Sequence, residues 1–67
     1  MNIEDVAKNL NKKVKYTSIT TRTESEYVLN ACILRLGEDG FYYSAELKET
    51  DRNAVVIVPL EKVKSRS

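Results

Sequence analysis

Few side chains in this chain have types that could support catalysis. The sequence contains one cysteine and no histidine. Histidine is the usual general base near neutral pH, so its absence excludes Cys–His and Ser–His–Asp arrangements. A zinc site needs several Cys or His ligands at short spacing, and a single cysteine cannot form an internal disulfide. We therefore expect a protein that is not an enzyme and that binds no metal and no cofactor.

The remaining reactive groups have simple structural interpretations. Cys32 lies in the apolar run Tyr27–Leu36, where we expect an inert, buried or half-buried thiol. Pairs of carboxylates occur only in turns or on a solvated strand face, where they mainly favour solubility. The two glycines, Gly37 and Gly40, both belong to one turn, so the chain has no glycine-rich phosphate-binding loop.

Basic side chains gather near both ends of the chain, although the net charge is only +1. If the first and last strands pair, these cations form one patch that could contact phosphates. The alternative interpretation is protection of an edge strand by lysine, together with a solubilising tail. The candidate nucleic-acid-binding residues are Lys12, Lys13, Lys15, Lys62, Lys64 and Arg66, with Tyr16 as an adjacent aromatic.

A protein-binding surface is the other candidate site. Tyr42 alternates with its neighbours Phe41 and Tyr43, so we expect it to point outward, with Leu34 or Ile33 beside it from the preceding strand. The strand that ends at Leu60 also carries apolar side chains on both faces, and the face outside the core must be covered by another element or by a partner. The candidate protein-binding residues are Tyr42, Leu34, Ser44, Val55 and Ile57.

The element that must position both sites is a three-stranded meander over residues 27–60. It contains a hairpin over Tyr27–Glu49, in which Asp39-Gly40 suits a type I turn with a G1 bulge, followed by a strand over Ala54–Leu60. In the second strand the alternation predicts an inner face, made of Phe41, Tyr43, Ala45 and Leu47. Tyr27–Leu36 is apolar at both parities, and a one-residue difference in the turn decides which parity is buried.

The segments around the meander are shorter. Residues 1–11 predict an amphipathic helix, with Asn2 as N-cap and Asn11 as its stop. Its apolar face consists of Ile3, Val6, Ala7 and Leu10. Residues 12–20 predict an edge strand, and residues 20–26 an exposed loop.

Pro59 cannot donate to a strand ladder, so pairing on one side is expected to end there. A single 3₁₀ turn over residues 59–63 then leads into a last short strand or a tail. We expect residues 64–67 to form a polar, frayed tail. The whole chain is thus one small domain, with a helix (1–11), a β-barrel or meander (12–63) and the tail.

The order of a strand, a polar loop, a long hairpin, a further strand and Pro59-Leu60-Glu61-Lys62-Val63 resembles an SH3-like small barrel, in which a 3₁₀ turn separates the last two strands. The resemblance covers residues 12–63 and is one of topology. The acidic-aromatic run and the tryptophan pair of peptide-binding SH3 domains are absent from the sequence. The predicted fold is therefore mainly β: a small antiparallel SH3-like barrel or a curved sheet of four to five strands, with one short N-terminal helix.

These observations favour a small, non-enzymatic binding module. Our first hypothesis is protein–protein interaction or inhibition of a partner protein, with self-association into a homo-oligomer, because 67 residues bury only a small core. The alternatives are nucleic-acid binding and capture of a small ligand or nucleotide between subunits. The single thiol and the absence of an apolar signal segment lead us to expect a cytoplasmic protein with no membrane contact. In style the sequence resembles small accessory proteins of bacteria or phages.

Overall fold

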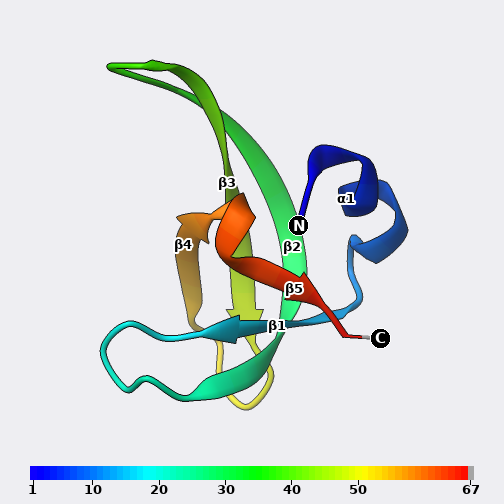
Figure 1. The fold of residues 1–67 in the computed structure, drawn as a ribbon. Coiled ribbons are helices and arrows are strands. Elements are labelled where there is room, and N and C mark those ends of the chain that lie inside the picture. The colour runs from blue at the N-terminus through cyan, green and yellow to red at the C-terminus, as the bar shows by residue number, and fades with distance from the viewer. Residues whose placement is uncertain (67) are drawn as a thin grey trace.

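The computed structural model describes residues 1–66 as one five-stranded antiparallel sheet with one short helix (Figure 1). The mainly β prediction, with a curved sheet and an N-terminal helix, is confirmed. Within the described residues the sheet is open, with strand order β4–β3–β2–β1–β5. The elements are α1 (Ile3–Asn9), β1 (Lys13–Thr17), β2 (Glu24–Gly37), β3 (Gly40–Glu49), β4 (Val55–Pro59), the 3₁₀ turn η1 (Leu60–Lys62) and β5 (Val63–Ser65).

Helix α1 has the predicted caps but covers less of the sheet than predicted. The Asn2 side chain accepts a hydrogen bond from the Asp5 backbone N–H at 3.0 Å, and Asn11 adopts a left-handed conformation with φ of 64°. Of the predicted apolar face only Val6 is buried. The prediction is wrong for the other three positions, because this two-turn helix reaches the core through Val6 alone. The exposed positions are Ile3, Ala7 and Leu10.

The hairpin of β2 and β3 has the predicted turn. Gly40 has a φ of +115°, and neither Glu38 nor Asp39 has a positive φ. This fits a type I turn closed by a G1 bulge and excludes a type I′ turn, which needs positive φ at both central residues. In β3, Ala45 and Leu47 are fully buried as predicted.

A β-bulge in β2 explains why this strand is apolar at both parities. Leu29 pairs with Leu47 and Ala31 pairs with Glu46, so Asn30 is an extra residue in the ladder. The extra residue moves the concave-side positions from odd to even numbers. Leu29 and Cys32 therefore lie on the same face. Odd-numbered residues face the core side before the bulge and even-numbered residues after it, so each of the two predicted parities is correct for one half of the strand.

Strand β1 lies inside the sheet. It pairs with β2 on one side and with β5 on the other, so the prediction of an edge strand is wrong. Strand β5 is the reason: Lys64 and Ser65, expected in a frayed tail, continue the ladder opposite Lys15 and Val14. Ser67, the last residue of the expected tail, lies outside the described residues.

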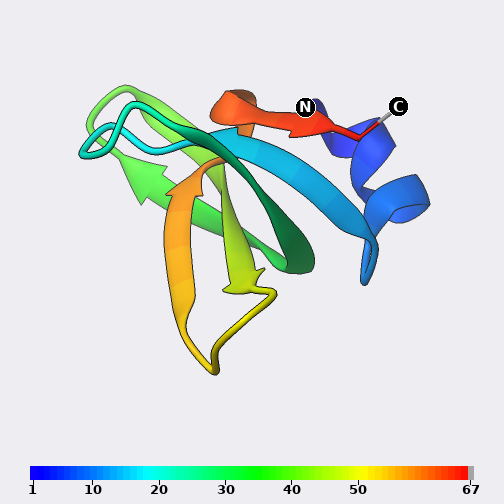
Figure 2. The same cartoon turned by 90° about the horizontal axis from the view of Figure 1, so that it is seen from below.

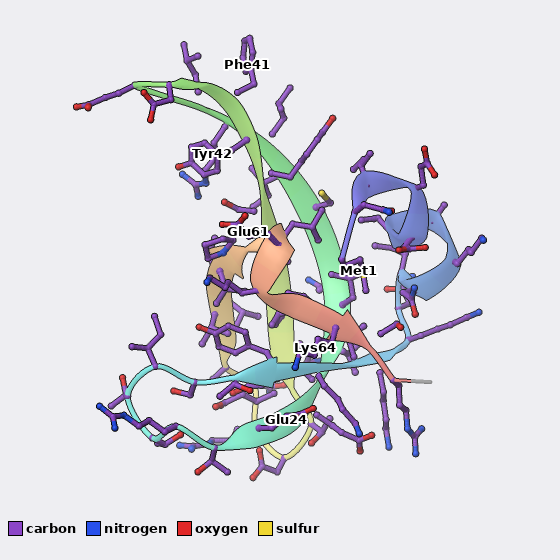
Figure 3. All side chains as sticks on the ribbon, in the orientation of Figure 1. Met1, Glu24, Phe41, Tyr42, Glu61 and Lys64 are labelled. Atoms are coloured by element: carbon purple, nitrogen blue, oxygen red, sulfur yellow. The ribbon has the colours of Figure 1, made fainter. Side chains whose placement is uncertain are left out.

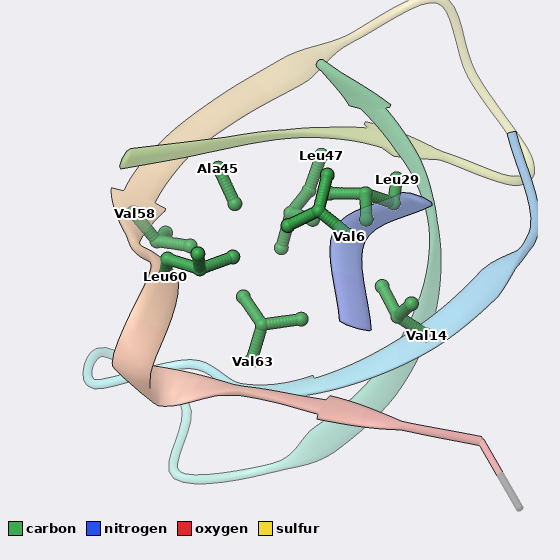
Figure 4. Packing of buried hydrophobic residues seen from close by; sticks show 8 residues of the cluster. All are labelled: Val6, Val14, Leu29, Ala45, Leu47, Val58, Leu60 and Val63. Carbon is green, nitrogen blue, oxygen red and sulfur yellow. The ribbon is translucent and has the colours of Figure 1, made fainter. Parts of the chain in front are cut away.

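The core fills the concave side of the bent sheet. Figure 4 shows its eight buried side chains surrounded by strands, by α1 and by the turn η1. The 3₁₀ turn, predicted after Pro59, connects the two edge strands β4 and β5 (Figure 2) and places Leu60 in the core. The core residues are Val6, Val14, Leu29, Ala45, Leu47, Val58, Leu60 and Val63.

Candidate functional site

The tip half of the β2–β3 hairpin extends beyond the rest of the sheet (Figure 1). Strand β1 pairs with β2 only over Glu24–Val28, and β4 pairs with β3 only over Ser44–Lys48. Among the described residues, the segment from Ala31 to Tyr43 therefore has strand partners only within the hairpin itself. We call this segment the arm.

The face of the arm that continues from the core side of β2 and β3 is apolar and exposed. The register places Leu34 opposite Tyr43 and Leu36 opposite Phe41, on the face that continues from the core. The exposed fractions are 56% for Leu34, 71% for Leu36, 72% for Phe41 and 40% for Tyr43. We call these four side chains the arm surface. Phe41 and Tyr43 were predicted on the buried inner face of the hairpin, and for their burial this prediction is wrong, because β4 is too short to reach them.

Tyr42 lies on the other face of the arm, on the opposite side of the ribbon from Phe41 (Figure 3). Tyr42 pairs with Arg35, and its ring lies over Gly37, where an added Cβ would be 3.1 Å from the Tyr42 Cε1 atom. Tyr42 is half exposed, as expected for an outward-facing side chain. Part of its ring is nevertheless occupied in covering a glycine, an arrangement that stabilises a strand.

The structure divides the predicted protein-binding residues between two faces. Tyr42, Ser44, Val55 and Ile57 share the convex side, whereas Leu34 lies on the concave side, and its place beside Tyr42 is taken by Ile33. Ser44 is only 4% exposed, so it offers little surface to a partner. Val55 and Ile57 are exposed, but Glu46 and Lys48 pair with them across β3 and interrupt that face with charges.

A shallow hollow of about 470 Å³ adjoins the arm surface. Tyr42 and Tyr43 contribute to it from the arm and Ile3 from helix α1, and the buried Leu60 also lines it. The exposed Ile3 side chain thus lies at the inner end of the arm surface, which extends the apolar area toward the helix.

The predicted basic residues come together over β1 and β5. Lys15 lies directly opposite Lys64, and Lys13 and Arg66 flank this pair along the two strands. Lys12, Lys13 and Arg66 line one hollow of about 710 Å³. Lys62 and Lys64 line another of about 530 Å³. We call Lys12, Lys13, Lys15, Lys62, Lys64 and Arg66 the basic strip.

Tyr16 lies on the other face of β1 from Lys15. It packs at the margin of the core, with its ring centroid 6.0 Å from that of Tyr27 in an edge-to-face arrangement. Its edge still lines the hollow that contains Lys62 and Lys64. The predicted aromatic partner therefore lies beside the basic strip and not within it.

Cys32 lies on the concave side of β2, opposite Ala45 and against the core. Burial raises the pKa of the Cys32 thiol above its ordinary value of 9.0. Within residues 1–66, no three His, Cys, Asp or Glu side chains gather where they could hold a metal ion. Over the same residues, no helix is long and apolar enough to cross a membrane.

Sequence reasoning missed three residues of the arm surface: Leu36, Phe41 and Tyr43. A signal for them was present, because the predicted hairpin spans 23 residues and the next strand only seven. A strand of that length cannot cover the whole hairpin. No known protein family, no curated protein and no solved structure matches this chain.

Proposed function

We propose that this chain is a protein-binding module and that the arm surface is its contact surface. The observation that carries the proposal is the position of Leu34, Leu36 and Phe41, more than half exposed on one face of a projecting hairpin. Large apolar side chains that lie together in water are costly to leave uncovered, and such patches commonly mark interaction sites.

The partner that this surface fits best is a second copy of the chain. The four side chains of the arm surface carry no charge, so they offer an ionic partner nothing to pair with. Two such surfaces are complementary to each other, because apolar groups of each cover those of the other across a two-fold axis. A small domain with a core of eight side chains also gains stability from an added interface.

The area of the arm surface sets the expected strength of this contact. From the exposed fractions, the four side chains leave roughly 450 Å² in water, since a whole aromatic side chain buries about 150–250 Å². Two copies together would bury about 900 Å², which is in the range of weak, transient complexes. We therefore expect reversible dimers with a Kd in the micromolar range or weaker, on the order of 10 to 100 μM.

Sedimentation equilibrium of the purified protein tests the proposal. The average mass should rise from that of one chain, 7.7 kDa, toward twice that mass as the concentration passes through the expected Kd. Phe41→Asp should keep the protein monomeric throughout, because it places a charge in the contact.

Val55→Asp is the matched control. Val55 is 52% exposed but lies on the convex side, so its variant should associate like the unmodified protein. A monomer at millimolar concentration, or equal association of the Phe41→Asp protein, would contradict the proposal.

A further inference from the structure

The lysines of β1 have no structural role as edge protection. Lysines on an edge strand prevent unwanted pairing with other chains. Strand β1, however, is paired on both sides, and Lys13 and Lys15 lie on its convex face. Their presence there needs another explanation.

The pairing of β1 with β5 places like charges directly opposite each other. Lys15 and Lys64 are cross-strand neighbours, and side chains in such a position lie about 5 Å apart at Cβ. Like charges at this separation destabilise a sheet. An anion that bridges the two ammonium groups would remove the repulsion.

The basic strip is only partly neutralised by its surroundings. Glu26 lies opposite Lys15 on β2, and its carboxylate is held by Arg66 at 2.9 Å. This is the only ion pair of the strip among residues 1–66, and the five lysines have no carboxylate within 4 Å there.

Four acidic residues lie around the strip: Asp5, Glu24, Glu26 and Glu61. Arg22 lines the same hollow as Lys62 and Lys64, so seven cations face four acids and leave a local charge of +3 on a chain whose net charge is +1. The remainder of the molecule carries −2, so the charge is separated between two regions. Such a separation directs a polyanion to one face.

We propose that the basic strip binds the phosphate backbone of a nucleic acid. Lys13 and Lys15 are two residues apart on one face, about 6.6 Å along the strand, and β5 supplies a second row of cations about 4.8 Å away. This array contacts a series of phosphates. The strip includes no aromatic side chain, and Tyr16 packs on the other face, so bases do not stack on it and binding is independent of sequence.

This inference is independent of the arm surface, which lies on the concave side of the hairpin. The test is fluorescence anisotropy with a labelled 20-nucleotide DNA, as a single strand and as a duplex, over a series of salt concentrations. We expect four to five phosphate contacts. These predict a slope of log K against log salt of about −3 for the single strand and about −4 for the duplex.

Two variants test the site directly. Lys15→Gln and Lys64→Gln should each weaken binding several-fold and reduce the steepness of the slope by about 0.7 for the single strand. Lys48→Gln is the control, because Lys48 is an exposed lysine of β3 outside the strip. Its affinity and its slope should not change.

A thermal melt separates loss of binding from loss of structure. Lys64→Gln removes the repulsion with Lys15, so its melting temperature should equal or exceed that of the unmodified protein. Binding of either DNA form with this response to the variants supports the proposal. Absence of binding at low salt, an equal loss with Lys48→Gln, or binding to vesicles of anionic lipid without binding to DNA would overturn it.

Discussion

Leu47→Asp should unfold this protein. Leu47 lies at the centre of the concave side and is fully buried. Its cross-strand neighbours are Leu29 on β2 and Val56 on β4, so three strands meet around its side chain. Within residues 1–66, no basic side chain pairs with this position on the concave face to compensate a carboxylate.

The expected cost has two parts. Loss of the buried leucine side chain removes about 1.5–3 kcal/mol of hydrophobic stabilisation. A carboxyl group in an apolar site has a pKa raised by about 3–5 units, which at neutral pH costs about 4 kcal/mol or more. The total of about 6 kcal/mol or more is comparable to the whole stability expected for 67 residues, about 3–10 kcal/mol.

Far-ultraviolet circular dichroism during heating measures the outcome, and Leu36→Asp is the matched control. Leu36 lies on the same face of the hairpin but is 71% exposed, beyond the end of the core. Its variant should melt cooperatively, within a few degrees of the unmodified protein at a concentration where both are monomeric. A cooperative melt of the Leu47→Asp protein at a similar temperature would refute this description of the core.

Three further predictions concern single side chains. Tyr42→Ala should change the free energy of unfolding by no more than about 1 kcal/mol, measured by urea titration, because the ring is half exposed and covers only a glycine; loss of the fold would contradict the face assignment. Gly40→Ala should cost about 1–2 kcal/mol in the same titration, because φ is +115°. Gly37→Ala should cost less, since the exposed Tyr42 ring can move, and the reverse order would contradict the turn geometry. Alkylation of Cys32 should be slow at neutral pH, because burial raises the thiol pKa. The folded state binds the thiol proton more tightly than the unfolded state, so this proton stabilises the fold below about pH 9, and the stabilisation is lost as the pH rises through the folded-state pKa. An alkylation rate equal to that of the unfolded chain would show that the thiol is accessible.

Much of the fold followed from local patterns. The Asp39-Gly40 pair predicted the hairpin and its turn, and the alternation in β3 predicted the burial of Ala45 and Leu47. The caps of α1 and the end of β4 at Pro59 also follow from single residues with known backbone preferences. These features depend on sequence neighbours, which is why they were predictable.

The features that were missed depend on contacts between distant segments. The bulge at Asn30 fits no sequence rule, because its position is set by the pairing of β2 with β3. The internal position of β1 required Lys64 and Ser65, near the C-terminal end of the sequence, to form a strand although their composition is polar. Polar composition at the end of a chain usually indicates fraying, and here the pairing with β1 overrides it.

The candidate sites were predicted to different extents. The grouping of the basic strip followed from one assumption, that the first and last strands pair, and the structure has that pairing. The face of Leu34 could not be predicted, because it depends on the bulge three to five residues earlier in the strand. The uncovered arm surface is a consequence of unequal strand lengths, which single-strand patterns do not report.

We propose that the arm surface is the contact between two copies of the chain. Backbone amide chemical shifts from two-dimensional NMR, recorded during dilution of the ¹⁵N-labelled protein, test it most directly. We predict concentration-dependent shifts at Leu34, Leu36, Phe41 and Tyr43, with little change along β1 and β5. Spectra that do not change with concentration, or shifts confined to the convex side of β3 and β4, would contradict the claim.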